Sequence, residues 1–393
     1  MIYNAPDSDY YKKAARILHT LKYVTLLLLI LLVVLGFTAY KSDITIENLR
    51  YLMRYADFDT GIDYMSYNQI SFLASDDAKF GYIKGDLALI SDNSFVTYDF
   101  TGEQLHRQKL SYLNPALKTS DKYALCYDVA GTGLSVFNSY SCIYSEDFEY
   151  GIRDADIRTD GSLALVTSGK YLSSRVAVLA PDSKEIFSWE TRDKEAVSVS
   201  LSEKKDEVAF AALRAENGDF TVSLQLYGFE SEQPRFAKEY FGEFPLKVYC
   251  FEGAVCMLTD KAIHFVAPDG SEISSFAHEP GAITGIFESG GFVAVTYAKS
   301  ISKNSTMKLF TAGGREIGTD NFENNIISFS AYGNNVYALE KGKLHIRKIN
   351  SEKDMLEYGN VSELSVDSLY EAVFAKSAGE YILVSPRGAG KFS

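Results

Sequence analysis

Short alternations of apolar and polar positions recur along most of this chain, and turn residues separate them. A strand with this alternation precedes a turn rich in Gly, Asp, Ser or Asn and then a shorter strand, as in RVAVLAPDSKEIFSWE from Arg175. Seven such hairpins occur. Their strand centres are spaced by 39, 41, 47, 40, 44 and 37 residues and lie at Tyr98, Phe137, Val178, Gln225, Phe265, Leu309 and Ile346. A period near 40 residues predicts a repeat architecture.

Two further strands are predicted between successive hairpins, for example in ADIRTDG and SLALVTSG. Four antiparallel strands per period are typical of a β-propeller blade, whereas a solenoid has shorter rungs and a sandwich does not repeat. Near the C-terminus SLYEAVFAKSAGEYILVSPRG supplies two inner strands, and IDYMSYNQISFLASDD precedes the first hairpin. If the strands of these two terminal segments pair in one blade, they close the ring. We therefore predict an all-β propeller of eight four-stranded blades over residues 64–393, with seven blades as the alternative.

One segment breaks the alternation: YVTLLLLILLVVLGFTAY, residues 23–40, is uncharged and lies between two lysines. Its 18 residues correspond to about 27 Å of helix, close to the ~30 Å of bilayer hydrocarbon, so we predict one transmembrane helix. A buried core helix and a cleaved signal peptide are the alternatives. The unbroken Leu/Val run argues against the first, and the lack of a small-x-small pair ending at Ala39 argues against the second.

The flanks of this segment predict its orientation. Basic residues lie in the predicted N-terminal tail, residues 1–22, at Lys12, Lys13, Arg16 and Lys22. The positive-inside rule then places the N-terminus in the cytoplasm and the propeller outside the cell membrane.

Residues 41–63 connect the span to the propeller. Apolar residues recur there at helical spacing, at Ile46, Leu49, Leu52 and Met53. We predict a short amphipathic helix and linker, with a solvated spacer as the alternative.

Charge narrows the classes of partner. The chain of 393 residues has a net charge of −13, and its first 22 residues hold four basic and two acidic side chains, which leaves −15 for the rest. An acidic domain repels nucleic acid and anionic lipid head groups. We expect no nucleic-acid partner and one contact with the membrane, through the helix.

The motifs of the chain resemble a family of membrane-anchored proteins catalogued as domain of unknown function family 5711. The resemblance is carried by Ile46 to Arg50, by GDLALISDNSFVTYDFTGEQ, by Leu110 to Asp128 and by Asp154 to Gly169. It covers nearly the whole length and implies an anchor and a propeller. It implies no functional residues.

Candidate chemistry is sparse. The five histidines have no metal-site spacing; they are His19, His106, His264, His278 and His345. Acids and bases do not recur in register on the predicted inner strands. Asp154, Asp156 and Asp160 could bind calcium, but the distal Glu of a calcium loop is missing and ordinary turns are as acidic. The Gly388–Lys391 run resembles half a phosphate loop, and a frayed tail explains it better.

The cysteines and the possible glycosylation sites add little chemistry. The four cysteines are Cys126, Cys142, Cys250 and Cys256; we expect free buried thiols, with a strained disulfide between Cys250 and Cys256 as the alternative. Asn304 and Asn360 begin glycosylation-type sequences, which occur often by chance.

These observations favour a binding module over an enzyme. We expect a single-pass propeller outside the membrane that binds or scaffolds an envelope protein or glycan, with no cofactor, no metal and no catalytic residue assigned. The alternative is a hydrolase or lyase that acts on envelope polysaccharide through acids meeting in the central channel.

Overall fold

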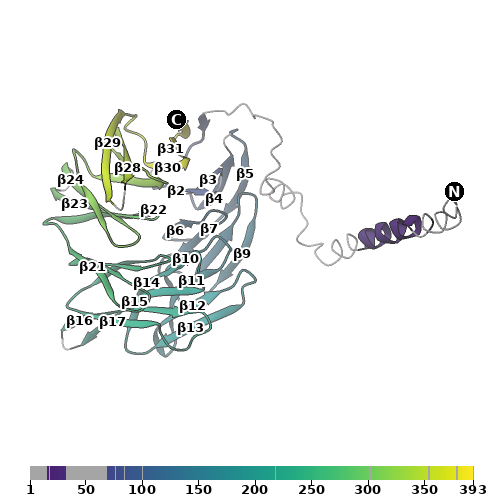
Figure 1. Cartoon of the computed structure of the whole chain (residues 1–393), viewed down its shortest axis with the longest axis horizontal. Helices are drawn as coiled ribbons and strands as arrows, with labels where there is room; N and C mark the ends of the chain where they lie inside the picture. The colour runs from purple at the N-terminus through teal and green to yellow at the C-terminus, as the bar shows by residue number, and fades with distance from the viewer. Residues whose placement is uncertain are drawn as a thin grey trace, which may run out of the picture. The chain divides into compact units, whose positions relative to one another are not determined.

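The computed structural model describes residues 16, 18–31 and 69–392, apart from residues 76, 84, 100, 217, 301, 302, 353, 354 and 378. The chain divides into two compact units, Met1–Ile62 and Asp63–Ser393. The described regular structure of the second unit is entirely β, in 32 strands (Figure 1).

These strands form eight antiparallel sheets of four strands each, which confirms the prediction of an eight-bladed propeller. Blade 1 contains β2 (Lys79–Ile83), β3 (Asp86–Ser91), β4 (Ser94–Asp99) and β5 (Gln104–Lys109), and blade 2 contains β6 (Pro115–Thr119), β7 (Ala124–Asp128), β8 (Gly133–Phe137) and β9 (Cys142–Asp147). Blade 3 contains β10 (Ile152–Ile157), β11 (Leu163–Gly169), β12 (Leu172–Leu179) and β13 (Glu185–Thr191), and blade 4 contains β14 (Glu195–Leu201), β15 (Glu207–Glu216), β16 (Asp219–Gly228) and β17 (Phe236–Phe241).

The next three blades follow the same order. They are β18 (Pro245–Cys250), β19 (Val255–Thr259), β20 (Ala262–Val266) and β21 (Glu272–Ala277); β22 (Ala282–Ser289), β23 (Phe292–Ser300), β24 (Lys303–Thr311) and β25 (Glu316–Phe322); and β26 (Ile326–Tyr332), β27 (Asn335–Glu340), β28 (Lys343–Glu352) and β29 (Met355–Ser365). The predicted strand centres all lie on the third strand of their blade.

Blade 8 joins the two ends of the propeller chain. It contains β30 (Ala372–Ser377), β31 (Glu380–Ser385) and β32 (Gly388–Phe392), and β1 (Gln69–Ser71) adds the outermost strand by pairing with β32. Closure by both ends was predicted, but the C-terminal segment supplies three strands, not two. The frayed-tail interpretation of Gly388–Lys391 is wrong because these residues form most of β32.

The glycines of β32 explain why this strand was not predicted from the sequence. Gly388 has φ of 149°, and a Cβ atom there would lie 2.4 Å from the carbonyl oxygen of Ile70. The short strands β1 and β32 can approach each other only because this position has no side chain. A glycine-rich strand has no apolar alternation for sequence analysis to detect.

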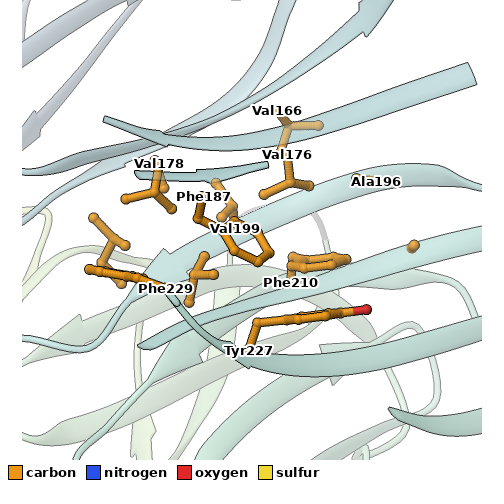
Figure 2. Close-up of a cluster of buried hydrophobic side chains, with 13 residues drawn as sticks. Val166, Val176, Val178, Phe187, Ala196, Val199, Phe210, Tyr227 and Phe229 are labelled. Atoms are coloured by element: carbon orange, nitrogen blue, oxygen red, sulfur yellow. The ribbon is translucent and has the colours of Figure 1, made fainter. Parts of the chain in front are cut away.

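Apolar side chains fill the space between neighbouring blades. Figure 2 shows the cluster between blades 3 and 4, where side chains from β11 and β12 meet side chains from β14, β15 and β16. Phe210 and Tyr227 stack there at 5.7 Å between ring centroids, and the single tryptophan, Trp189, packs against Phe210. Each blade is therefore covered on both faces, which is why its middle strands are buried at nearly every position.

The connections between strands define two faces of the ring. We label the strands of each blade A to D from the first, innermost strand outward; the A strands of blades 1 to 5 contact one another in series, as do those of blades 6 to 8. The B-to-C and D-to-A connections lie at one end of the strands, here the BC/DA face. The A-to-B and C-to-D connections form the opposite AB/CD face.

The N-terminal unit is described only in part. Residues 18–31 are helical, and the described residues contain no helix that is both long enough and apolar enough to cross a membrane. Residues 32–40 of the predicted span lie outside the described residues, as do Lys12, Lys13 and the predicted juxtamembrane segment 41–63. Arg16 and Lys22 belong to the described part.

All four cysteines are free, as expected. Cys250 pairs in register with Val255, and Cys256 pairs with Tyr249, so the two thiols do not face each other across the hairpin. Burial raises the pKa of the Cys250 and Cys256 thiols, which keeps them protonated and unreactive.

The closure strand should contribute strongly to stability through one side chain. Ile70 is buried in the cluster between blades 8 and 1. We expect Ile70→Ala to lower the free energy of unfolding by roughly 2–5 kcal/mol. Urea unfolding of the full chain, followed by Trp189 fluorescence, measures the loss. Leu73→Ala, three residues on and largely exposed, is the matched control and should change it by less than about 0.5 kcal/mol.

Candidate functional site

Polar side chains on the A strands join several neighbouring blades. The backbone N–H groups of Val199 and Leu201 in blade 4 donate to Asp154 Oδ2 and Asp156 Oδ2 in blade 3, at 3.1 and 2.9 Å. The pattern repeats between blades 4 and 5, where Ser198 and Ser200 accept, and between blades 7 and 8, where Ser328 and Ser330 accept. An A strand has no further strand on its inner side, so these side chains supply the missing acceptors.

Asp154 is the centre of a polar cluster, which we call the channel cluster: Lys118, Tyr127, Asp154, Asp156, Ser198 and Lys247. Lys247 Nζ of blade 5 donates to both Asp154 oxygens, at 2.9 and 3.2 Å. Lys118 Nζ of blade 2 lies 3.4 Å from Asp154 Oδ1 and 3.7 Å from Asp156 Oδ1. The Tyr127 and Ser198 hydroxyl groups also donate to Asp154. One carboxylate thus connects four consecutive blades.

The charges in the channel cluster stabilise one another. Burial opposes ionisation of Asp154, but the Lys118 and Lys247 ammonium groups outweigh it and hold the pKa of Asp154 well below its usual range. Burial acts against Lys118 as well, yet Asp154 and Asp156 raise its pKa. Burial and the nearby Lys118 ammonium lower the pKa of Lys247. The arrangement is a charge-compensated clamp whose oxygen atoms are already engaged.

Glu288, at the end of the A strand of blade 6, differs from these residues. Part of its side chain reaches solvent, but the surrounding protein and the negative charge of Asp156 raise the pKa of Glu288 to about 7. Burial and the charge of Glu288 in turn raise the pKa of Tyr249. Side chains of blades 3, 5 and 6 therefore act on one another near the ring centre, and the pKa of Glu288 lies near neutrality.

The structure separates the three aspartates that were considered for calcium. Asp154 and Asp156 lie on β10 in the channel cluster, whereas Asp160 lies in the following turn, where it pairs with Arg158 and accepts the Ser162 N–H. No group of three His, Cys, Asp or Glu residues suited to a metal ion occurs among the described residues.

The channel cluster could not be predicted from the sequence because its members do not recur in register. Lys118 and Lys247 each occupy a position that no other A strand fills with lysine. A detectable signal was present in the alternating acceptors, which read Asp-Ala-Asp from Asp154, Ser-Val-Ser from Ser198 and Ser-Phe-Ser from Ser328.

Two histidines hold blades together internally. His264 Nε2 lies 2.9 Å from Glu243 Oε2, and its Nδ1 lies 3.1 Å from Ser275 Oγ. This set has the chemistry of a hydrolytic triad. In blade 7, His345 on the equivalent strand places Nε2 2.9 Å from Glu340 Oε1 and Nδ1 3.7 Å from Glu363 Oε1. The glutamates are not equivalent, because Glu340 ends the second strand of its blade whereas Glu243 lies in the connection into blade 5.

Exposed apolar side chains gather on one face of the ring. In the described propeller residues, the four large apolar side chains exposed by 75% or more all lie at the BC/DA face: Leu73, Leu113, Tyr171 and Phe241. Phe220 and Phe244 lie at the same face with 46% and 42% exposed. Rigid strands thus present a set of apolar loop residues, an arrangement typical of protein interaction surfaces.

The fold defines the class of the molecule: an eight-bladed β-propeller in which side-chain hydrogen bonds near the centre join several neighbouring blades. The chain belongs to the Family of unknown function (DUF5711), whose profile matches residues 60–389.

Solved structures with similar folds have very different sequences. The C-terminal WD40 domain of Sif2 is 9% identical with a TM-score of 0.55, and the similarity covers 83% of this chain and 97% of that one. BamB from Moraxella catarrhalis is 8% identical with a TM-score of 0.50, covering 82% and 100%. These similarities establish the propeller fold only. No curated protein sequence matches the chain.

Removing the charge at the centre of the channel cluster should destabilise the ring. Asp154→Asn leaves Lys247 without its paired carboxylate and Lys118 with Asp156 alone, so we expect the free energy of unfolding to fall by about 3–5 kcal/mol. Thermal or urea unfolding of the full chain checks this. Asp160→Asn, in the exposed turn after the same strand, is the matched control and should cost less than about 1 kcal/mol. Equal effects of the two substitutions would contradict the clamp.

Glu288 should make stability depend on pH near neutrality. The folded protein binds the carboxyl proton of Glu288 more tightly than the unfolded chain does, in which a Glu has a pKa near 4.5. The free energy of unfolding should therefore fall as the pH rises from about 4.5 to about 7. We expect Glu288→Gln to melt at a higher temperature than the wild type at pH 8, with the difference vanishing near pH 4.5. Glu232→Gln, in an exposed connection, should leave the pH profile unchanged; an unchanged profile in Glu288→Gln would refute the assignment.

Proposed function

We propose that this protein is a membrane-anchored, extracytoplasmic propeller that binds or scaffolds an envelope protein or glycan without catalysing a reaction. The observation that carries the proposal is the concentration of exposed apolar side chains on the BC/DA face. Exposing 97% of Leu113 to water does not stabilise a ring that has no partner. On a docking surface the same exposed side chain favours association, because a partner that covers it removes apolar area from water.

The engaged state of the channel cluster supports a non-catalytic role. The oxygen atoms of Asp154 accept from Lys247, Ser198, Tyr127 and a backbone N–H group. A general base must have a lone pair available to the substrate proton. The ring centre therefore supports the scaffold, and the loops are left for binding.

The described helix supports the anchor. Its apolar side chains are largely exposed, with Leu18 at 66% and Leu27 at 67%, so they need an apolar environment. The hydroxyl groups of Thr20 and Thr25 donate to the carbonyl oxygens of Arg16 and Leu21, both at 2.8 Å, which satisfies them inside the helix. Arg16 and Lys22 lie toward the N-terminal end, consistent with a cytoplasmic N-terminus.

One observation favours the alternative of a channel hydrolase or lyase. Glu288 has the raised pKa of a general acid and lies close enough to Asp156 to feel its charge. If that alternative were correct, the purified full chain would release soluble saccharide from envelope polysaccharide, and Glu288→Gln would abolish the release.

Photo-cross-linking in intact cells tests the binding function. A photoreactive phenylalanine replaces Leu113 on the BC/DA face and, as control, Tyr332 on the AB/CD face. We expect one reproducible adduct with an envelope protein or glycan from position 113 and none from position 332. Adducts from position 332 alone, or from neither position, would overturn the proposal.

Location is checked in the same cells. An amine reagent that does not cross membranes should label propeller lysines without cell lysis. Labelling only after lysis would refute the extracytoplasmic assignment while leaving the adducts interpretable.

A further inference from the structure

A cavity of about 240 Å³ opens where blade 8 closes the ring. Three segments line it: the end of β1, the B-to-C connection of blade 8 with the residues beside it, and the connection from blade 7 into blade 8. All three lie at the BC/DA face. The lining includes Ile70, Ser71, Asp367, Leu369, Tyr370 and Arg387, and we call this site the closure cavity.

Hydrogen bonds hold the segments around the closure cavity in place. The Ala74 N–H donates to the carbonyl oxygen of Pro386 at 2.8 Å, which ties the chain after β1 to the B-to-C connection. In the connection from blade 7, the Leu369 N–H donates to Asp367 Oδ1 at 3.0 Å and the Tyr370 N–H donates to the Asp367 carbonyl oxygen at 3.2 Å. A ligand would meet a preformed site, which lowers the entropic cost of binding.

Three polar groups that line the cavity are available to a ligand. Within the part of the chain that the structure describes, the Arg387 guanidinium, the second carboxylate oxygen of Asp367 and the Ser71 hydroxyl have no hydrogen-bond or ion-pair partner. The guanidinium donates only, the carboxylate accepts only, and the hydroxyl can do both. The cavity therefore offers donors and acceptors from three different segments.

The charges of the closure cavity favour a neutral ligand. Arg387 and Asp367 are its charged lining residues, and they lie on different connections with no ion pair between them in the described structure. An anion would meet the carboxylate, and a cation would meet the guanidinium. An apolar side chain would cover both charges without giving them hydrogen bonds, which is costly. A neutral ligand with several hydroxyl groups can bond to both.

The size and the apolar part of the lining fit one sugar ring. A cavity of about 150 Å³ holds benzene, so about 240 Å³ can take a six-membered ring with its hydroxyl groups. Ile70 is buried, Leu369 is 43% exposed, and the Tyr370 ring is fixed by an edge-to-face contact with Phe392 at 6.4 Å between centroids. These side chains supply apolar area for the C–H groups of the ring.

We propose that the closure cavity binds one pyranose unit of an envelope glycan, whose hydroxyl groups bond to Arg387, Asp367 and Ser71 while its C–H groups contact Leu369 and Tyr370. The inference rests on the proposed binding function, and it selects a glycan rather than a protein as the ligand of this part of the BC/DA face.

Saturation-transfer NMR on the purified full chain tests the proposal. The chain is kept in a detergent that has no sugar head group, so that the detergent does not compete. The probes are the methyl pyranosides of glucose, galactose, mannose and N-acetylglucosamine. We expect saturable transfer to at least one of them with a Kd of about 1 mM, as is usual for a ligand of about a dozen non-hydrogen atoms.

Two substitutions should weaken this binding. Asp367→Asn keeps the oxygen that accepts the Leu369 N–H but removes the charge, and Arg387→Gln removes the guanidinium. Each should raise the Kd about tenfold, because a hydrogen bond to a charged group is lost. Asp219→Asn makes the same acid-to-amide change at an exposed position of blade 4 on the same face and should leave the Kd within twofold. Melting of each variant, followed by Trp189 fluorescence, confirms that the ring remains folded.

Cross-linking in intact cells identifies the natural ligand. The photoreactive phenylalanine replaces Leu369 in the full chain, beside the position 113 and 332 variants. We expect an adduct from position 369 whose added mass is lost on periodate oxidation, which cleaves the vicinal diols of sugars. A periodate-resistant adduct with a protein would refute the saccharide as the ligand.

The remaining outcomes separate the two proposals. Saturation transfer to none of the four probes, or a Kd unchanged in both Asp367→Asn and Arg387→Gln, would overturn the closure cavity as a sugar site. If position 113 still gave its adduct, the proposed function would stand. If neither position 113 nor position 369 gave an adduct, both proposals would be overturned.

Discussion

The innermost strand of every blade has one edge that no further strand can pair, and the ring depends on how that edge is satisfied. A backbone N–H group buried without an acceptor costs about as much as a lost hydrogen bond, and a propeller multiplies the problem by its number of blades. At three blade boundaries, short acceptors on alternate positions of the preceding blade solve it, as Asp154 and Asp156 do for blade 4.

This solution explains the charges at the ring centre. Aspartate is a stronger acceptor than serine, but its charge must be balanced once it is buried, and Lys118 and Lys247 provide the balance from two other blades. Polar residues in a propeller channel therefore need not indicate catalysis. The proposed binding surface lies on a loop face instead, where the strands hold exposed residues such as Leu113 and Phe220.

The sequence predicts the blades well and the contacts between them poorly. Alternation and a 40-residue period are local patterns, so the number of blades and the hairpins followed from them. The longest spacing, 47 residues between Val178 and Gln225, spans the connection into blade 4, whose long central hairpin projects. The channel cluster unites residues up to 129 positions apart, from Lys118 to Lys247, and only the closed ring brings them together. Strand β32 was not predicted because the close approach of its backbone to β1 requires glycine, and glycines interrupt the alternation of apolar and polar residues.

The closure of blade 8 has a mechanical consequence. In the described part of the chain, three residue pairs, from Gln69 with Gly390 to Ser71 with Gly388, hold β1 to its sheet, and the Phe72 and Ala74 N–H groups donate to the carbonyl oxygens of Arg387 and Pro386. Any tension on the polypeptide that precedes Gln69 reaches the ring through this seam and loads its hydrogen bonds before those of any complete blade. A pull from the N-terminal side would detach the outermost strand of one blade first, and the seven blades built from continuous chain would stay intact until that strand had been released.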